Sequence, residues 1–150
     1  MPRHHVGTLA LGREQVIVAA GGHLGAYRRD SGSPLWSETG QRGVGMYFEE
    51  FVGVCTIGEL VYAGRGEYNP RGFRLEARES ETGALRWSWP AESTTVRPAF
   101  AWRFRGAGDT LYIPSLDGLW GVRASDGTQL WHLAYAPIFD AFLAVAISDA

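Results

Sequence analysis

The sequence predicts an all-β fold, a partial β-propeller of four-stranded antiparallel blades with about three blades and the first strand of a fourth. Three observations predict it. A Gly-x(3)-Trp motif occurs three times, and its glycines are 51 and 44 residues apart. Short β-branched or aromatic runs, bounded by turn residues, surround each copy. No stretch of useful length shows a sustained helical period.

The motif predicts a tight turn followed by a strand that ends a blade. Its structural repeat residues are Gly32, Gly83 and Gly127, followed four positions later by Trp36, Trp87 and Trp131. A short loop between antiparallel strands often ends in the left-handed backbone region, which glycine enters without steric cost. A blade needs its faces covered by neighbours, so a large aromatic on its outermost strand is expected to fill the wedge between blades. We therefore interpret these tryptophans as packing residues.

Each predicted blade contains three candidate strands before the tryptophan strand. The first blade covers about residues 6–38, the second about 50–89 and the third about 98–134. The candidate strands are 6–11, 16–20 and 24–28 in the first blade, 51–57, 60–64 and 73–78 in the second, and 99–104, 111–115 and 119–123 in the third. The tail FLAVAISDA (142–150) matches the first strand of a fourth blade.

A closed propeller ring requires at least about four blades, which is more than the three complete blades predicted here. Two explanations stay open: further blades in a longer chain, or a second copy whose blades complete the ring. The sequence ends within the predicted fourth blade, which favours the first explanation, that the chain is a fragment of a longer propeller. The expected partner is thus either a protein or further propeller blades, from the same or another chain.

Composition excludes several classes of function. The 150 residues carry a formal net charge of −2, which argues against a nucleic-acid binder. All 14 basic residues are arginine, so no P-loop or Schiff-base lysine exists. The single cysteine, Cys55, forbids an intramolecular disulfide and lies in an apolar run typical of a buried thiol. The histidines show no metal-ligand spacing, and we expect no catalytic or metal residues.

The spacing Ala-x(5)-Gly-x(3)-Trp resembles the blade motif of quinoprotein-like (PQQ-like) β-propellers, A-x-D-x-x-T-G-x-x-x-W. Here it reads AYRRDSGSPLW (26–36), ARESETGALRW (77–87) and GVRASDGTQLW (121–131). The usual aspartate is replaced by Arg28, Glu79 and Arg123. The resemblance implies a propeller fold. Dehydrogenases of this family are similar in carrying a quinone, calcium, an acidic base and often a disulfide between adjacent cysteines, which lone Cys55 cannot form.

The two irregular connections, 39–50 and 65–73, predict a candidate binding face. Strand alternation places both at the end of the blades opposite the short hairpin turns, and long loops on a rigid scaffold often carry binding. A solvated loop without a partner is the alternative. The candidate residues are Arg42, Met46, Tyr47, Arg65, Glu67, Tyr68, Asn69 and Arg71.

These features favour a non-catalytic PQQ-like propeller module that binds a protein or ligand through its loop-rich face. The alternatives are a fragment of a PQQ-dependent dehydrogenase, and a structural or sensor repeat like those of extracytoplasmic assembly factors. We expect no cofactor; PQQ and calcium belong only to the dehydrogenase alternative. No signal peptide is evident, which predicts a cytoplasmic protein as written, or a periplasmic or extracellular one if residues precede Met1.

Overall fold

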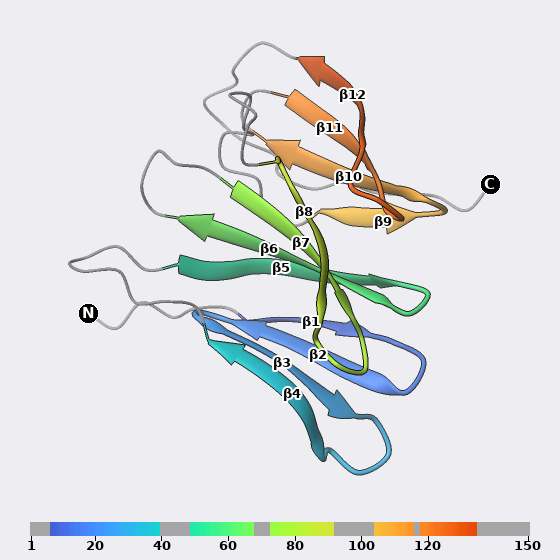
Figure 1. Cartoon of the computed structure of the whole chain (residues 1–150). Coiled ribbons are helices and arrows are strands. Elements are labelled where there is room, and N and C mark those ends of the chain that lie inside the picture. Colours follow the sequence, from blue (N-terminus) through green and yellow to red (C-terminus); the bar gives the residue numbers. More distant parts are fainter. Residues whose placement is uncertain (1–6, 40–48, 68–72, 92–103, 116–117, 135–150) are drawn as a thin grey trace.

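The computed structural model describes residues 7–39, 49–67, 73–91, 104–115 and 118–134. These residues form three four-stranded antiparallel sheets (Figure 1). The first sheet holds β1 (Thr8–Leu11), β2 (Gln15–Ala20), β3 (His23–Arg28) and β4 (Pro34–Thr39). The second holds β5 (Glu49–Ile57), β6 (Leu60–Glu67), β7 (Phe73–Glu79) and β8 (Leu85–Trp89). The third holds β9 (Arg105–Ala107), β10 (Thr110–Ser115), β11 (Gly118–Arg123) and β12 (Gln129–Ala134).

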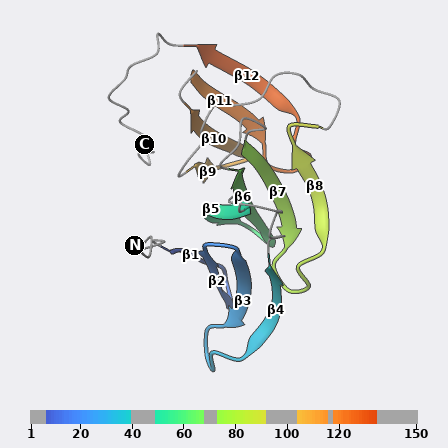
Figure 2. The ribbon, with the colours of Figure 1, turned by 90° about the vertical axis from the view of Figure 1, so that its left-hand side faces the viewer.

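Within each sheet the strands follow chain order as an up-and-down meander. The sheets stack face to face, with the second between the first and third (Figure 2). The first strands β1, β5 and β9 gather on one side, and the fourth strands β4, β8 and β12 lie on the other. A hydrogen bond of 2.9 Å from Thr56 Oγ1 to the Leu11 carbonyl joins β5 to β1. The described segments include no helix that could cross a membrane.

Two hydrophobic cores hold the stack together. The core between the first and second sheets includes Ile17, Leu24 and Val61, all fully buried. The core between the second and third includes Leu75 and Trp120, also fully buried. Burying one such side chain contributes about 1.5–3 kcal/mol. The second sheet therefore contributes buried apolar side chains on both faces, as expected of a sheet between two neighbours.

The repeated glycines close the third-to-fourth-strand hairpins in the same way. Gly32, Gly83 and Gly127 have φ of 71°, 74° and 76°, the left-handed region. Each N–H donates to the carbonyl four residues earlier at 2.9 Å. A register shift follows at the same place in each hairpin, after Ala26, Ala77 and Gly121. The extra residue of this β-bulge strengthens the local twist of the outer strand.

Most of the strand predicted at 99–104 lies outside the described residues, which resume at Phe104, and β9 begins at Arg105. The Phe104 ring is buried edge-on against Phe73, at 6.2 Å between ring centroids. The sequence also predicts an inserted loop at 65–73. In fact β6 runs to Glu67 and β7 begins at Phe73, so part of the insertion lengthens the hairpin. The predicted strand at 142–150 lies outside the described residues.

Candidate functional site

Both long connections leave the same end of the second sheet. Segment 40–48 leads into β5 at Glu49, and segment 68–72 follows the last residue of β6, Glu67. Glu49 and Glu67 are register partners on neighbouring strands, and Phe73 pairs with Gly66 on the other side. The points where the two connections meet the sheet are therefore adjacent, at the end marked by the arrowhead of β6 (Figure 1).

Most of the predicted binding residues lie outside the described part of the chain. These are Arg42, Met46, Tyr47, Tyr68, Asn69 and Arg71. Glu67 is the last residue of β6. Their role as a binding face stays a prediction. Arg65 is described in full, and its guanidinium takes part in a network of ion pairs between the first two sheets.

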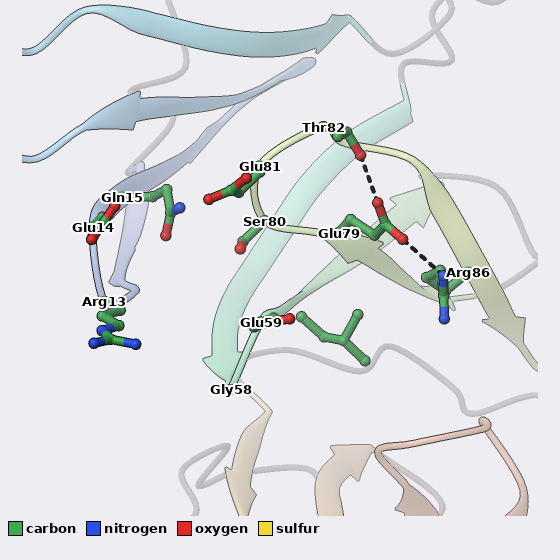
Figure 3. Close-up of a pocket in the computed structure, with 11 residues that line it drawn as sticks. Arg13, Glu14, Gln15, Gly58, Glu59, Glu79, Ser80, Glu81, Thr82 and Arg86 are labelled. Carbon is green, nitrogen blue, oxygen red and sulfur yellow. Dashed lines mark hydrogen bonds and ion pairs between the residues drawn. The ribbon is translucent and has the colours of Figure 1, made fainter.

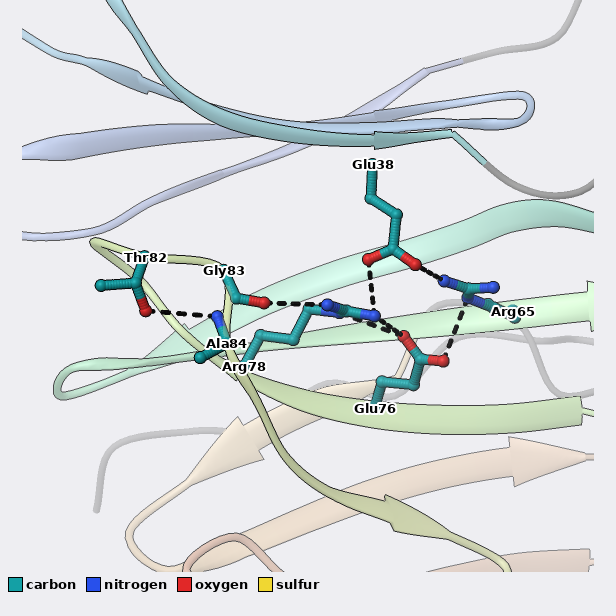
Figure 4. A network of polar contacts seen from close by, with 7 residues as sticks. All are labelled: Glu38, Arg65, Glu76, Arg78, Thr82, Gly83 and Ala84. Carbon is teal, nitrogen blue, oxygen red and sulfur yellow. Dashed lines mark hydrogen bonds and ion pairs between the residues drawn. The ribbon is translucent and has the colours of Figure 1, made fainter.

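The network joins Glu38 of β4 to Arg65, Glu76 and Arg78 of the second sheet (Figure 4). Glu38 pairs with Arg65 through Oε1 and with Arg78 through Oε2 at 2.6 Å. Glu76 pairs with Arg65 Nε at 3.2 Å and with Arg78 Nη2 at 2.9 Å. Two carboxylates thus alternate with two guanidinium groups, so the four charges sum to zero.

Three of the four side chains of this network are largely shielded from water, and Glu38 is 31% exposed. The side chains of Glu76, Arg78 and Arg65 are 7%, 11% and 14% exposed. The Arg65 guanidinium also lies 4.8 Å from the ring centre of Phe51, a cation–π contact. Arg78 Nη1 donates to the Gly83 carbonyl at 2.8 Å, which ties the network to the hairpin turn. The arrangement anchors β4 to the base of the hairpin β6–β7 from which segment 68–72 leaves.

The sequence carries a signal for part of this network. Glu76 and Arg78 are two residues apart on one strand, so their side chains share a face. In the structure that face packs on the first sheet. Their partners Glu38 and Arg65 cannot be assigned without knowing which strands of adjacent sheets align.

A polar pocket of about 550 Å³ lies at the opposite end, between the first and second sheets (Figure 3). Its lining side chains include two arginines and four glutamates, a formal charge of −2. Glu79 accepts hydrogen bonds there from Arg86 at 2.8 Å and from Thr82 at 2.9 Å. The lining residues are Arg13, Glu14, Gln15, Gly58, Glu59, Leu60, Glu79, Ser80, Glu81, Thr82 and Arg86.

Each of two repeat tryptophans lies on the hairpin turn of the next sheet. Trp36 covers Gly83, where a Cβ atom would lie 2.7 Å from the indole Cδ2. Its Nε1 donates to the Ser80 carbonyl at 2.8 Å. Trp87 covers Gly127 in the same way, and its Nε1 donates to the Ala124 carbonyl at 3.1 Å. The turn glycine thus has two uses: it permits the left-handed backbone and it leaves room for an indole.

The thiol of Cys55 lies beside the core of the second and third sheets. Burial raises its pKa to about 12, while the positive charge of Arg105 opposes this rise. Cys55 is therefore protonated and unreactive near neutral pH.

The described ranges contain no group of three His, Cys, Asp or Glu side chains that could hold a metal ion. With a single cysteine, they also cannot form the adjacent-cysteine disulfide of quinone dehydrogenases.

No protein-family model and no curated protein matches the chain. Solved structures do. BamB from Moraxella catarrhalis matches with 20% identity and a TM-score of 0.53, over 83% of this chain and 38% of that chain. A quinohemoprotein alcohol dehydrogenase from Pseudomonas putida matches with 18% identity and a TM-score of 0.62, over 86% of this chain and 26% of that chain. Both are PQQ-like β-propellers. The fold is that of a PQQ-like β-propeller.

A third similar structure, Myxococcus xanthus glutaminyl cyclase, has 14% identity and a TM-score of 0.56, over 86% of this chain and 53% of that chain. The chain therefore spans between about a quarter and a half of the length of these proteins. Each four-stranded sheet is one blade, and the three described blades form an open arc. These levels of identity show the fold alone.

Proposed function

We propose that this chain is a non-catalytic propeller repeat module that binds a protein or ligand at the end from which segments 40–48 and 68–72 leave. The observation that supports the proposal is the register pair Glu49–Glu67, which brings the two connections to adjacent positions. The ion pairs of Glu38, Arg65 and Arg78 fix the strands beneath them. A fixed base lowers the conformational entropy that loops lose on binding.

The tyrosines and arginines of these segments have the composition of a contact surface. Tyr47 and Tyr68 can bury a large ring at low entropic cost, and Arg42 and Arg71 can make forked hydrogen bonds. The connections at the other end are tight hairpin turns, which contain Arg13 and Arg29 but no tyrosine. Further blades would still be needed to close the ring.

Site-specific photocrosslinking tests the proposal. A photoreactive amino acid at Tyr47 or Tyr68 in the native host should give a discrete crosslinked species. The control positions are Arg13 and Glu81, which are exposed at the opposite end of the blades. Crosslinks from both ends alike, or none from Tyr47 and Tyr68, would contradict the proposal.

Part of a quinone-dependent dehydrogenase is the second candidate. It rests on the blade motif and on the fold shared with the Pseudomonas putida enzyme. Incubation of the chain with PQQ and calcium, followed by absorbance, separates the two candidates. We expect no stoichiometric binding, and saturable one-to-one binding would favour the dehydrogenase.

A further inference from the structure

The tryptophan-on-glycine contact between blades leaves one member of each kind unmatched. Trp36 and Trp87 lie on the turn glycines of the following blades. Among the described residues, Trp131 of the third blade covers no turn glycine and is 39% exposed. Gly32, in the turn of the first blade, has no described atom within 4 Å of the position that a Cβ would take. The third blade therefore presents an exposed indole, and the first blade presents a turn glycine on which an indole could pack.

The turn of Gly32 is built like the two turns that accept an indole. Its φ of 71° and its closing bond match those of Gly83 and Gly127. The Arg29 N–H donates to the Glu14 carbonyl at 2.8 Å. The equivalent bond of the second blade runs from the Ser80 N–H to the Glu59 carbonyl at 3.0 Å. The Arg29 carbonyl thus corresponds to the Ser80 carbonyl, which accepts the Trp36 indole.

The outward face of the first blade is apolar. Register pairs Leu9↔Val18 and Leu11↔Val16 place these four side chains on one face. The two leucines are 65% and 56% exposed. In the second blade, Val61 takes the position of Val16 and is fully buried against the preceding blade. The first blade thus carries the residues of a blade-packing face.

The outward face of the third blade carries the matching elements. The rings of Tyr112 and Trp131 lie 6.0 Å apart and tilted by 51°. The pair Tyr62–Trp87 has nearly the same geometry, at 5.8 Å and 46°, and both of its members donate to Ala124 of the next blade. Leu133 extends this face and is 62% exposed.

We propose that this chain associates head to tail with a second copy of itself, with Trp131 of one copy lying on the Gly32 turn of the other. Two such contacts, related by a twofold axis, join the three described blades of each copy into a closed ring of six. Propellers typically close with four to eight blades, so six is a permitted number. The proposal is independent of the loop-rich binding end, because it uses the outward faces of the first and third blades.

Sedimentation equilibrium of the 150-residue chain tests the proposal. The expected mass is twice 16.4 kDa. Trp131→Ala removes the indole, and Gly32→Ala fills its place with a methyl group. Each variant should raise the dimer dissociation constant by at least about tenfold, because a central aromatic contact dominates such an interface. A folded wild-type chain that stays monomeric, or that forms species larger than a dimer, would overturn the proposal.

Gly58→Ala is the matched control. Gly58 has a φ of 59°, and no described atom lies within 4 Å of the position that its Cβ would take. It therefore shares the backbone strain of Gly32 without being a tryptophan site, and its replacement should leave the dissociation constant unchanged. If Gly32→Ala and Gly58→Ala shift the dissociation constant equally, the contact is not where we place it.

Mixing the two variants gives a second readout that misfolding cannot imitate. A Trp131→Ala copy retains Gly32, and a Gly32→Ala copy retains Trp131. The mixture therefore restores one of the two contacts and should form a heterodimer more tightly than either variant alone. Failure of the mixture to associate better than the separate variants would contradict the proposed pairing.

Discussion

Trp87 and Gly127 meet across the second and third blades, where a Cβ atom on the glycine would lie 2.6 Å from Cε3 of the indole. Trp36 and Gly83 repeat this relationship between the first and second blades. The motif that marks the repeat in the sequence thus forms the contact between blades. Its tryptophan packs on the turn of the following blade, and its glycine accepts the tryptophan of the preceding blade. The two tryptophans of these contacts therefore serve to pack one blade on the next.

The indole hydrogen bonds predict unequal costs for the same substitution. Trp36→Phe removes the donor to the Ser80 carbonyl, for which the described residues offer no second side-chain donor. Trp87→Phe leaves the Ala124 carbonyl with its bond of 3.0 Å from Tyr62 Oη. We expect Trp36→Phe to lower the free energy of unfolding by about 1 kcal/mol more than Trp87→Phe, measured by urea denaturation. Equal losses would show that the hydrogen bond contributes little.

The ion pairs between blades predict a large effect of removing one buried charge. Glu76→Gln removes one of the two carboxylates that pair with Arg65 and Arg78, and should lower the free energy of unfolding by about 3–5 kcal/mol. Glu79→Gln is the matched control on the same strand, because the pair Glu79–Arg86 is exposed and contributes about 0–1 kcal/mol. Urea denaturation of both variants measures the difference. Similar losses would contradict a shielded network.

Stability should fall at alkaline pH. Burial raises the pKa of Cys55 and that of Tyr62 to about 12, from 9.0 and 10.0 for the free groups. Above pH 9 the unfolded chain releases protons that the folded chain retains, so the free energy of unfolding decreases with rising pH. The loss approaches about 1.4 kcal/mol per pH unit for each group. Below pH 9 this contribution is fully present.

Cys55→Ala is the variant that checks this assignment. Urea denaturation between about pH 8 and about pH 11 should show a shallower decline for the variant than for the wild-type chain. An unchanged slope would mean that the thiol already titrates in the folded protein.

The fold could be predicted because its signals are local and repeated. A left-handed turn needs glycine wherever it occurs, so Gly32, Gly83 and Gly127 mark equivalent positions without knowledge of the three-dimensional structure. The ion-pair network could not be predicted because Glu38 and Arg65 are 27 residues apart and meet only when two blades stack in one register. The sequence predicts that Arg65 lies in a binding loop, because an insertion relative to the other blades begins there. The sequence does not show that β6 extends into this insertion and buries the Arg65 side chain.

The central claim is that the turn glycine makes room for the tryptophan of the preceding blade, and Gly83→Ala tests it most directly. Gly58→Ala is the reference, since it introduces alanine at a similar φ into open space and should cost about 1–2 kcal/mol. Gly83→Ala carries the same strain and also places a methyl group against Trp36, which should add about 1–3 kcal/mol. The measurement is the free energy of unfolding in urea. A clearly larger loss for Gly83→Ala is the predicted result, and equal losses for the two variants would contradict the claim.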